Sequence, residues 1–230
     1  MEENWQEFKG SYQQLLPRLE NCIEAKLLFG ARTESDIVCT QGMESVFLYN
    51  LQEDGWDWDR FAEDFANIKS LTIRDGQEVS EKIFDIRSLR YLELSGCELR
   101  AFHFDKIVQL TELEDLIIEN SVLGDVPEVI FRMAALKNLS FMGTKIKELH
   151  DNLRKLKNLE YLGLNMVGMN QVPAFIGELT NLTSLYLGAN NIKELPEELK
   201  NLTKLEHLAL WGTSLEDLPD WICSLEQLRG

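Results

Sequence analysis

Three histidines and four cysteines are the residues of this sequence that most often act as general bases, nucleophiles or metal ligands. They are His103, His150, His207, Cys22, Cys39, Cys97 and Cys223. No Ser-His-acid, Cys-His or HExxH pattern brings a histidine beside a catalytic partner, and the cysteines lack CxxC spacing. There is also no glycine-rich phosphate loop. We therefore predict no catalytic residue, no metal site and no cofactor, and a protein that is not an enzyme.

Acidic residues cluster in the stretch LQEDGWDWDRFAEDFANI, which makes calcium binding a hypothesis to consider. The EF-hand order requires acids at alternate positions, then a glycine and a distant glutamate, and this order is absent. We interpret Asp57 or Asp59 instead as the N-cap of a short helix whose Phe61, Phe65 and Ile68 pack inward.

The elements that position the remaining side chains come from a sequence repeat. Written in rows of 23 residues from Leu113, the chain aligns with itself, and one row reads LTSLYLGANNIKELPEELKNLTK. Columns 1, 4, 6, 11 and 14 are apolar in every row. The alternation at columns 4 and 6 predicts a short strand, and the later LPxxIxxL spacing predicts a helical or 3₁₀ turn started by proline. Less regular rows begin at Leu89, Ile68 and Met43, which makes about eight units.

This pattern resembles leucine-rich repeats, in particular the 23-residue LxxLxLxxNxLxxLPxxIxxLxx type of intracellular, Ras-group-like and bacterial members. The resemblance covers about residues 43–228. It implies an α/β fold, namely a right-handed solenoid with a curved parallel sheet on its concave face and short helical or 3₁₀ segments on its convex face. We expect an N-terminal helical cap over residues 1–42 and the solenoid over residues 43–230.

The ninth column departs from the family pattern, which has an asparagine that bonds the backbone of the turn. Asn190 is the family residue, whereas Cys97, Ser121 and Thr144 are stand-ins that keep a donor. Val167 has no hydrogen-bonding side chain. We therefore expect the ladder of hydrogen bonds along this column to loosen at Val167.

The repeat also shows which side chains folding does not require. Because columns 4 and 6 point inward, columns 3, 5 and 7 must point outward from the sheet, and we call their residues the concave face. An acidic band on this face consists of Glu93, Asp115 and Glu119. An aromatic patch consists of Met142, Tyr161, Tyr186, His207 and Trp211. Together with Tyr91 these residues form the candidate partner-binding site, since Tyr, Trp and Met are enriched where proteins meet partners. The alternative is that the aromatic rings only cover one another across strands.

The two ends of the chain do not follow the repeat. Within residues 2–29, apolar residues from Trp5 to Ile23 recur at spacings of three and four and predict an amphipathic helix that is interrupted at Pro17. We interpret this helix as a cap on the first coil, and docking to another chain is the alternative. The final SLEQLRG stops where a ninth row would open. We expect this uncapped coil to be covered by self-association or by an extension of the chain, or to fray.

Charge and hydropathy restrict the partners and the compartment. The chain has 39 acidic and 23 basic residues, a net charge of -16, so its field repels phosphate backbones and anionic lipid heads. We expect neither nucleic acid nor a membrane as a partner. A basic leader with an apolar run is absent, as is any apolar stretch of membrane-spanning length, so we expect a cytoplasmic protein. A secreted protein that has lost its leader is the alternative.

These observations favour a scaffold that binds another protein or a peptide on the concave face. The aromatic patch would provide affinity, and the acidic band would select a basic segment and exclude acidic competitors. Two alternatives stay open. One is a carbohydrate-binding or ligand-sensing module whose sugar rings stack on Tyr161, Tyr186 and Trp211. The other is the regulatory or targeting part of a longer enzyme.

Overall fold

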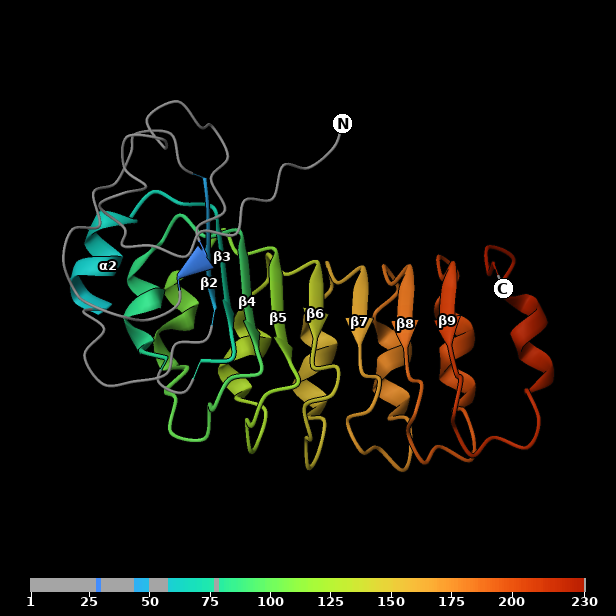
Figure 1. Ribbon diagram of the computed structural model, residues 1–230. Helices are drawn as coiled ribbons and strands as arrows, with labels where there is room; N and C mark the ends of the chain where they lie inside the picture. The colour runs from blue at the N-terminus through green and yellow to red at the C-terminus, as the bar shows by residue number, and fades with distance from the viewer. Residues whose placement is uncertain (1–27, 30–43, 50–57, 77–78, 230) are drawn as a thin grey trace, which may run out of the picture.

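The computed structural model describes residues 28–29, 44–49, 58–76 and 79–229. They form a parallel sheet of nine strands whose order in space follows their order in the chain, with 3₁₀ segments behind the sheet (Figure 1). The strands are β1 (Leu28–Phe29), β2 (Ser45–Tyr49), β3 (Ser70–Arg74), β4 (Tyr91–Ser95), β5 (Asp115–Glu119), β6 (Asn138–Ser140), β7 (Tyr161–Gly163), β8 (Ser184–Tyr186) and β9 (His207–Ala209). The helical segments are α2 (Trp58–Asp64), η2 (Glu81–Asp85), η3 (Asp105–Gln109), η4 (Glu128–Arg132), η5 (Asp151–Lys155), η6 (Ala174–Glu178), η7 (Glu197–Asn201) and η8 (Asp220–Ser224). The predicted solenoid of strand and 3₁₀ coils is confirmed.

The strands pair in one constant register. Ser70 of β3 pairs with Tyr91 of β4, Tyr91 pairs with Asp115 of β5, and the same column continues through β8 to His207 of β9. The register confirms the alignment of the rows, including the irregular rows at the start of the solenoid. Residues that share a column therefore lie on neighbouring strands, about 4.8 Å apart.

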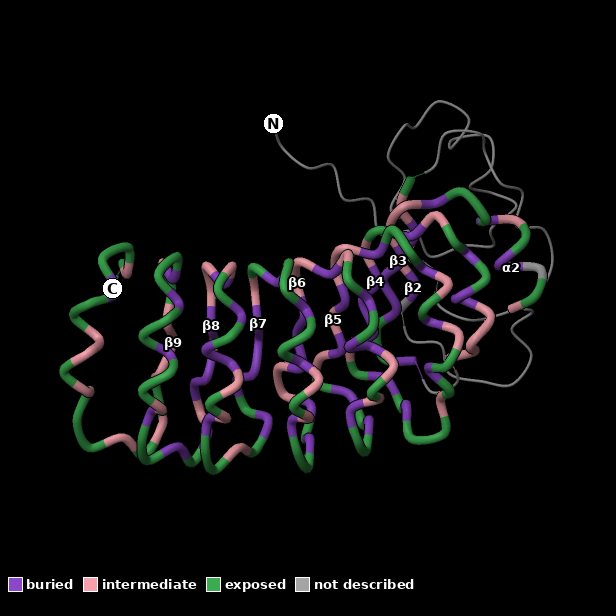
Figure 2. The backbone as a smooth tube through the Cα atoms, turned by 180° about the vertical axis from the view of Figure 1, so that it is seen from behind, coloured by how far each residue is buried: buried purple, intermediate pink, exposed green. Residues whose placement is uncertain are grey.

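The inward columns form one continuous core between the sheet and the 3₁₀ segments. Leu92 and Leu94 of β4 have no exposed surface, and the same holds for Leu185 and Leu187 in the coil of β8 (Figure 2). Each coil is too thin to bury these side chains alone, so they are covered by the coils on either side. In the coil of β9, the equivalent Leu208 is only partly buried.

The eighth column turns the chain at the end of each strand. Its residues adopt the left-handed conformation, with φ between 49° and 70° at Asp75, Gly96, Asn120, Gly143, Met166, Ala189 and Gly212. Glycine and asparagine suit this conformation, whereas Met166 and Ala189 hold it at a cost of about 1–3 kcal/mol each. The turn is therefore imposed by stacking of the coils, even where the local residue disfavours it.

The start of the solenoid agrees only in part with the sequence interpretation. The predicted helix is α2, and its Phe61 and Phe65 are fully buried, as expected. Asp59 lies inside α2 and forms an ion pair with Lys82, so it is not the N-cap. Asp57 lies outside the described residues.

The predicted N-terminal helix, from Trp5 to Ile23, lies outside the described residues. Within the segment predicted as a helical cap, Leu28–Phe29 form β1 and pair with Phe47 and Leu48 of β2. At these two residues the segment is a strand and not a helix. The edge of a parallel sheet exposes backbone donors and acceptors that a strand satisfies and a helix does not.

The ninth column contains the expected ladder of hydrogen bonds. Four of its side chains donate to carbonyl oxygens of the preceding coil, as the amide of Asn190 does to Leu164 over 2.7 Å. Thr213 donates instead to Leu210 of its own coil. Val167 is fully buried and has no polar group to offer. The carbonyl oxygen of Phe141 accepts instead from the main-chain amide of Thr144 in its own coil, over 2.9 Å. The ladder is thus interrupted at Val167.

Removal of an inward leucine tests the shared core. We expect Leu185→Ala to lower the free energy of unfolding by about 2–5 kcal/mol, because it leaves a cavity that two neighbouring coils cannot fill. Urea unfolding followed by circular dichroism measures this loss. The matched control is Leu218→Ala, since Leu218 is 58% exposed and should contribute less than about 0.5 kcal/mol. Equal losses in the two variants would contradict the shared core.

Restoration of the ladder tests the ninth column. We expect Val167→Asn to raise the free energy of unfolding by about 0.5–1.5 kcal/mol, because the amide can bond the turn as Asn190 does. Urea unfolding again provides the measurement. Val122→Asn is the control, because Val122 is 39% exposed and outside this column. A Val167→Asn variant that is less stable than the wild type would contradict the interpretation.

Candidate functional site

The concave face is formed by the side chains that leave the sheet away from the core. Strand β5 shows the alternation, with Asp115, Ile117 and Glu119 partly exposed and Leu116 and Ile118 buried. The sheet therefore places the third, fifth and seventh columns side by side across neighbouring coils, as the sequence predicts. All nine residues proposed for the partner-binding site lie on this face.

At the beginning of the concave face, a carboxylate is enclosed by a cation and a phenol. Glu93 is 7% exposed and accepts hydrogen bonds from Nε of Arg74 at 2.8 Å and from the hydroxyl of Tyr91 at 2.7 Å. The guanidinium of Arg74 lies 5.2 Å from the centre of the Phe47 ring. We call Phe47, Arg74, Tyr91 and Glu93 the Arg74 cluster. Glu93 is therefore not part of an open acidic band, which corrects the sequence interpretation.

The contacts of the Arg74 cluster shift the protonation of its members. The hydrogen bond to Glu93 raises the pKa of Arg74, and partial burial opposes this effect. The pKa of Tyr91 is raised first by burial, then by its hydrogen bond to Glu93 and by the charge of that carboxylate. The cluster thus stabilises the charged guanidinium and the neutral phenol together.

Asp115 and Glu119 are what remains of the acidic band. Asp115 accepts a hydrogen bond from the side-chain amide of Asn138, and Glu119 accepts one from the hydroxyl of Ser140. Within the described part of the chain, neither carboxylate forms an ion pair. Their hydrogen-bond partners are neutral, although Lys137 attracts Asp115 and Arg74 attracts Glu119 through their charges.

The aromatic patch is brought together across β6 to β9. The rings of Tyr161 and Tyr186 lie 5.2 Å apart, centre to centre, and the hydroxyl of Tyr161 is 3.5 Å from the sulfur of Met142. Trp211 follows β9 and is 56% exposed. His207, at the start of β9, is exposed too. Met142, Tyr161 and Tyr186 therefore contact one another, and Trp211 and His207 stay exposed on the neighbouring coil.

Gly188 allows Trp211 to lie on the sheet. A Cβ atom at Gly188 would come within 2.7 Å of two indole atoms, Cε2 and Nε1, so any larger residue would push the ring away. A Cβ at Gly163 would similarly approach the hydroxyl of Ser140 to 2.5 Å and the ring of Tyr161 to 3.1 Å. Gly163 belongs to the fifth column of the repeat and Gly188 to the seventh. The structure shows that they form the floor under the aromatic rings.

Two of the residues with catalytic chemistry, Cys97 and His150, have structural positions, whereas Cys223 is exposed and free. Cys97 is buried, and burial raises the pKa of its thiol to about 11, which disfavours a nucleophilic thiolate. His150 caps η5 by accepting a hydrogen bond at Nδ1 from the amide of Asn152. The described residues contain no group of three or more acidic, histidine or cysteine side chains that could hold a metal ion. Among them there is also no helix long and apolar enough to cross a membrane.

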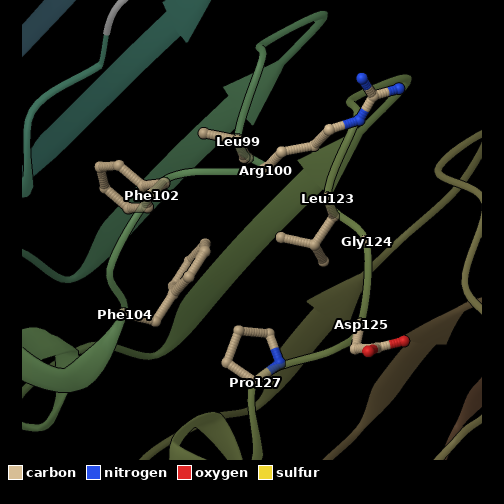
Figure 3. Close-up of a pocket in the computed structure, with 8 residues that line it drawn as sticks. All are labelled: Leu99, Arg100, Phe102, Phe104, Leu123, Gly124, Asp125 and Pro127. Atoms are coloured by element: carbon tan, nitrogen blue, oxygen red, sulfur yellow. The ribbon is translucent and has the colours of Figure 1, made fainter.

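A pocket of about 310 Å³ lies away from the concave face, where the coils of β4 and β5 descend toward η3 and η4. Figure 3 shows Phe102 and Phe104 on one side and Leu123 and Pro127 on the other, with the charged ends of Arg100 and Asp125 pointing outward. Two of its apolar walls are almost entirely buried, with Phe104 4% and Leu123 5% exposed. The pocket therefore offers a ligand little apolar surface, and the concave face is the stronger candidate.

Comparison with protein families agrees with this geometry. Residues 67–189 match the family described as leucine-rich repeat region, and residues 180–223 match leucine-rich repeats in two copies. The chain belongs to the leucine-rich repeat family. None of the curated proteins compared with the chain matches it.

Solved leucine-rich repeat structures have the same fold. A leucine-rich repeat protein of Leptospira interrogans has a TM-score of 0.73 at 21% identity, over 97% of this chain and 63% of its own. An internalin of Listeria monocytogenes has a TM-score of 0.67 at 19% identity, over 82% of this chain and 53% of its own. The plant peptide hormone receptor RGFR1, in complex with RGF2, has a TM-score of 0.62 at 20% identity, over 98% of this chain and 36% of its own. This leucine-rich repeat chain thus spans less than two thirds of the length of each.

Alkaline titration tests the Arg74 cluster. The pKa of Tyr91 is raised in the folded state, so the stability contributed by its phenol is present below about pH 10 and is lost as the pH rises through the folded-state pKa. In Glu93→Gln we expect phenolate absorbance to appear at lower pH, because the hydrogen-bonded carboxylate no longer opposes ionisation. The control is Glu226→Gln, which changes an exposed glutamate elsewhere. Identical titration curves for Glu93→Gln and the wild type would contradict the assigned contact.

Proposed function

We propose that this leucine-rich repeat protein is a scaffold that binds another protein or an extended peptide on its concave face, with the aromatic patch as the main contact. The observation that supports this most is Trp211, whose indole lies over Gly188 and is 56% exposed. A large apolar ring in a fixed, exposed position is uncommon without a partner. We therefore assign affinity to this ring and to its neighbour Tyr186.

The arrangement of the rings favours recognition by a rigid surface. Tyr161 is held by Tyr186 and Met142, and Trp211 rests on the backbone, so little rotational freedom is lost when a partner binds. The hydroxyl of Tyr186 and the indole Nε1 of Trp211 have no hydrogen-bond partner among the described residues. They can therefore bond the backbone of a bound segment.

A second feature concerns the charge of the partner. Asp115 and Glu119 lie next to the aromatic patch and form no ion pair within the described part of the chain. They favour a basic segment in the partner and disfavour an acidic one, and the net charge of -16 acts in the same direction over a longer range. The same charge disfavours nucleic acid and anionic membranes as partners.

The fold neighbours are consistent with peptide binding. RGFR1 is a peptide hormone receptor and was solved in complex with RGF2. This coil architecture can therefore present its surface to a bound ligand of that kind. The identity of 20% limits this support to the fold, so the residues proposed for contact rest on the geometry of this chain alone.

A displayed library of random peptides, selected on the immobilised wild-type protein, tests the proposal. We expect selected peptides to bind at least roughly tenfold more weakly to a Tyr186→Ala, Trp211→Ala double variant, because both anchors are removed. Fluorescence anisotropy measures the affinity, and circular dichroism checks that the variant is folded.

The control is the double variant Val108→Ala, Leu218→Ala, which removes two exposed apolar side chains outside the concave face. It should bind as the wild type does. If the selected peptides bind both double variants equally well, the aromatic patch is not the binding site. A glycan array treated in the same way distinguishes the carbohydrate-binding alternative, which requires glycan binding that is lost with Tyr186 and Trp211.

A further inference from the structure

The concave face has two places where a carboxylate lies near an aromatic ring, and only one of them contains a cation. In the Arg74 cluster, the guanidinium of Arg74 bonds Glu93 at 2.8 Å and lies 5.2 Å from the ring centre of Phe47. This arrangement combines a charge-assisted hydrogen bond with a cation–π contact. Arg74 therefore shows that a guanidinium is stabilised between a carboxylate and an aromatic ring on this surface.

The second place is formed by Glu119, Ser140 and Tyr161. They lie on a diagonal across β5, β6 and β7, two columns apart from one strand to the next, as Arg74 and Glu93 do across β3 and β4. The hydroxyl of Ser140 donates to Glu119. The same hydroxyl and the ring of Tyr161 are among the atoms that a Cβ at Gly163 would meet first, so Ser140 and Tyr161 both lie over this glycine.

Glu119 also acts electrostatically on Tyr161. The pKa of Tyr161 is raised first by burial and next by the negative charge of Glu119. The hydroxyl of Tyr161 has only the sulfur of Met142 as a partner among the described residues, and sulfur is a weak acceptor. A strong acceptor and an aromatic ring thus lie together without a cation between them.

No cation of the described chain can complete this second place. Apart from Arg74, the described residues of the concave face include no lysine or arginine. Arg74 is already engaged by Glu93. Within the described part of the chain, the positive charge for this place is thus left for a partner to supply.

We propose that an arginine of the partner binds between Glu119 and Tyr161, in the manner of Arg74 in its own cluster. Its guanidinium donates to the carboxylate of Glu119 and stacks on the Tyr161 ring, while its aliphatic part packs on Ile117. Arginine fits better than lysine, because its planar, weakly hydrated guanidinium can bond a carboxylate and stack on a ring at once. Asp115, on the same strand, adds attraction. The inference rests on the proposed function and specifies the chemistry of the partner.

The peptide selection described above provides the test. We expect the selected peptides to be enriched in arginine, and replacement of that arginine by its neutral isostere citrulline to weaken binding roughly tenfold. Replacement by lysine should cause a smaller loss, roughly threefold, because the charge remains but the stacking and the planar fork are lost. Fluorescence anisotropy with purified peptides measures each affinity.

Variants of the protein locate the arginine. In Glu119→Gln, which keeps the shape of the side chain, the arginine and citrulline peptides should bind with nearly equal affinity. Glu194→Gln is the matched control, since it removes one exposed negative charge outside the concave face. In this control, the arginine peptide should still bind roughly tenfold more tightly than the citrulline peptide.

The outcomes separate this inference from the proposed function. If peptides depend on Tyr186 and Trp211 but not on an arginine, the inference is wrong and the proposed function stands. If the preference for arginine persists in Glu119→Gln, the arginine binds elsewhere and the inference is also wrong. If no selected peptide depends on Tyr186 and Trp211, both proposals fail.

Discussion

Parallel pairing in one register is the constraint on which the rest of the structure depends. Because Ser70, Tyr91 and Asp115 face one another on β3, β4 and β5, every column of the sequence becomes a continuous row on the molecule. The inward columns then merge into one core, and the ninth column becomes a ladder of hydrogen bonds. The outward columns become a surface whose composition folding does not fix. Even the strained left-handed turns at Met166 and Ala189 follow from this stacking.

The two halves of that surface are chemically different. Near β3 and β4, the polar groups satisfy one another, since Arg74 and Tyr91 both bond Glu93. From β5 onward, the described carboxylates of this face have only neutral hydrogen-bond partners, and the aromatic rings are partly exposed. A partner gains little by displacing contacts in the first half, because each displaced bond must be replaced. The second half offers groups whose interactions are incomplete, so recognition is expected there.

Periodicity and register were predictable from the sequence because they repeat. A leucine at column 4 or 6 is supported by the same column in every other row, which is why Leu92 and Leu185 could be assigned to the core. Contacts that occur once have no such support. Arg74 and Glu93 lie on neighbouring coils and two columns apart. Neither residue type predicts that the two side chains pair. The floor at Gly188 could be interpreted as close packing, but the indole that lies on it could not be identified.

Glycine on the concave face links folding to recognition. In the fifth and seventh columns, a larger residue at Gly163 or Gly188 would be tolerated by the backbone but would displace the rings of Tyr161 and Trp211. The absence of a side chain there lowers the rings onto the sheet and limits their rotation. Rings that are held in place before binding lose little conformational entropy when a partner covers them. A larger part of the contact energy then appears as binding free energy. The same floor connects the two proposed contacts, because Gly163 lies beside Ser140, whose hydroxyl donates to Glu119.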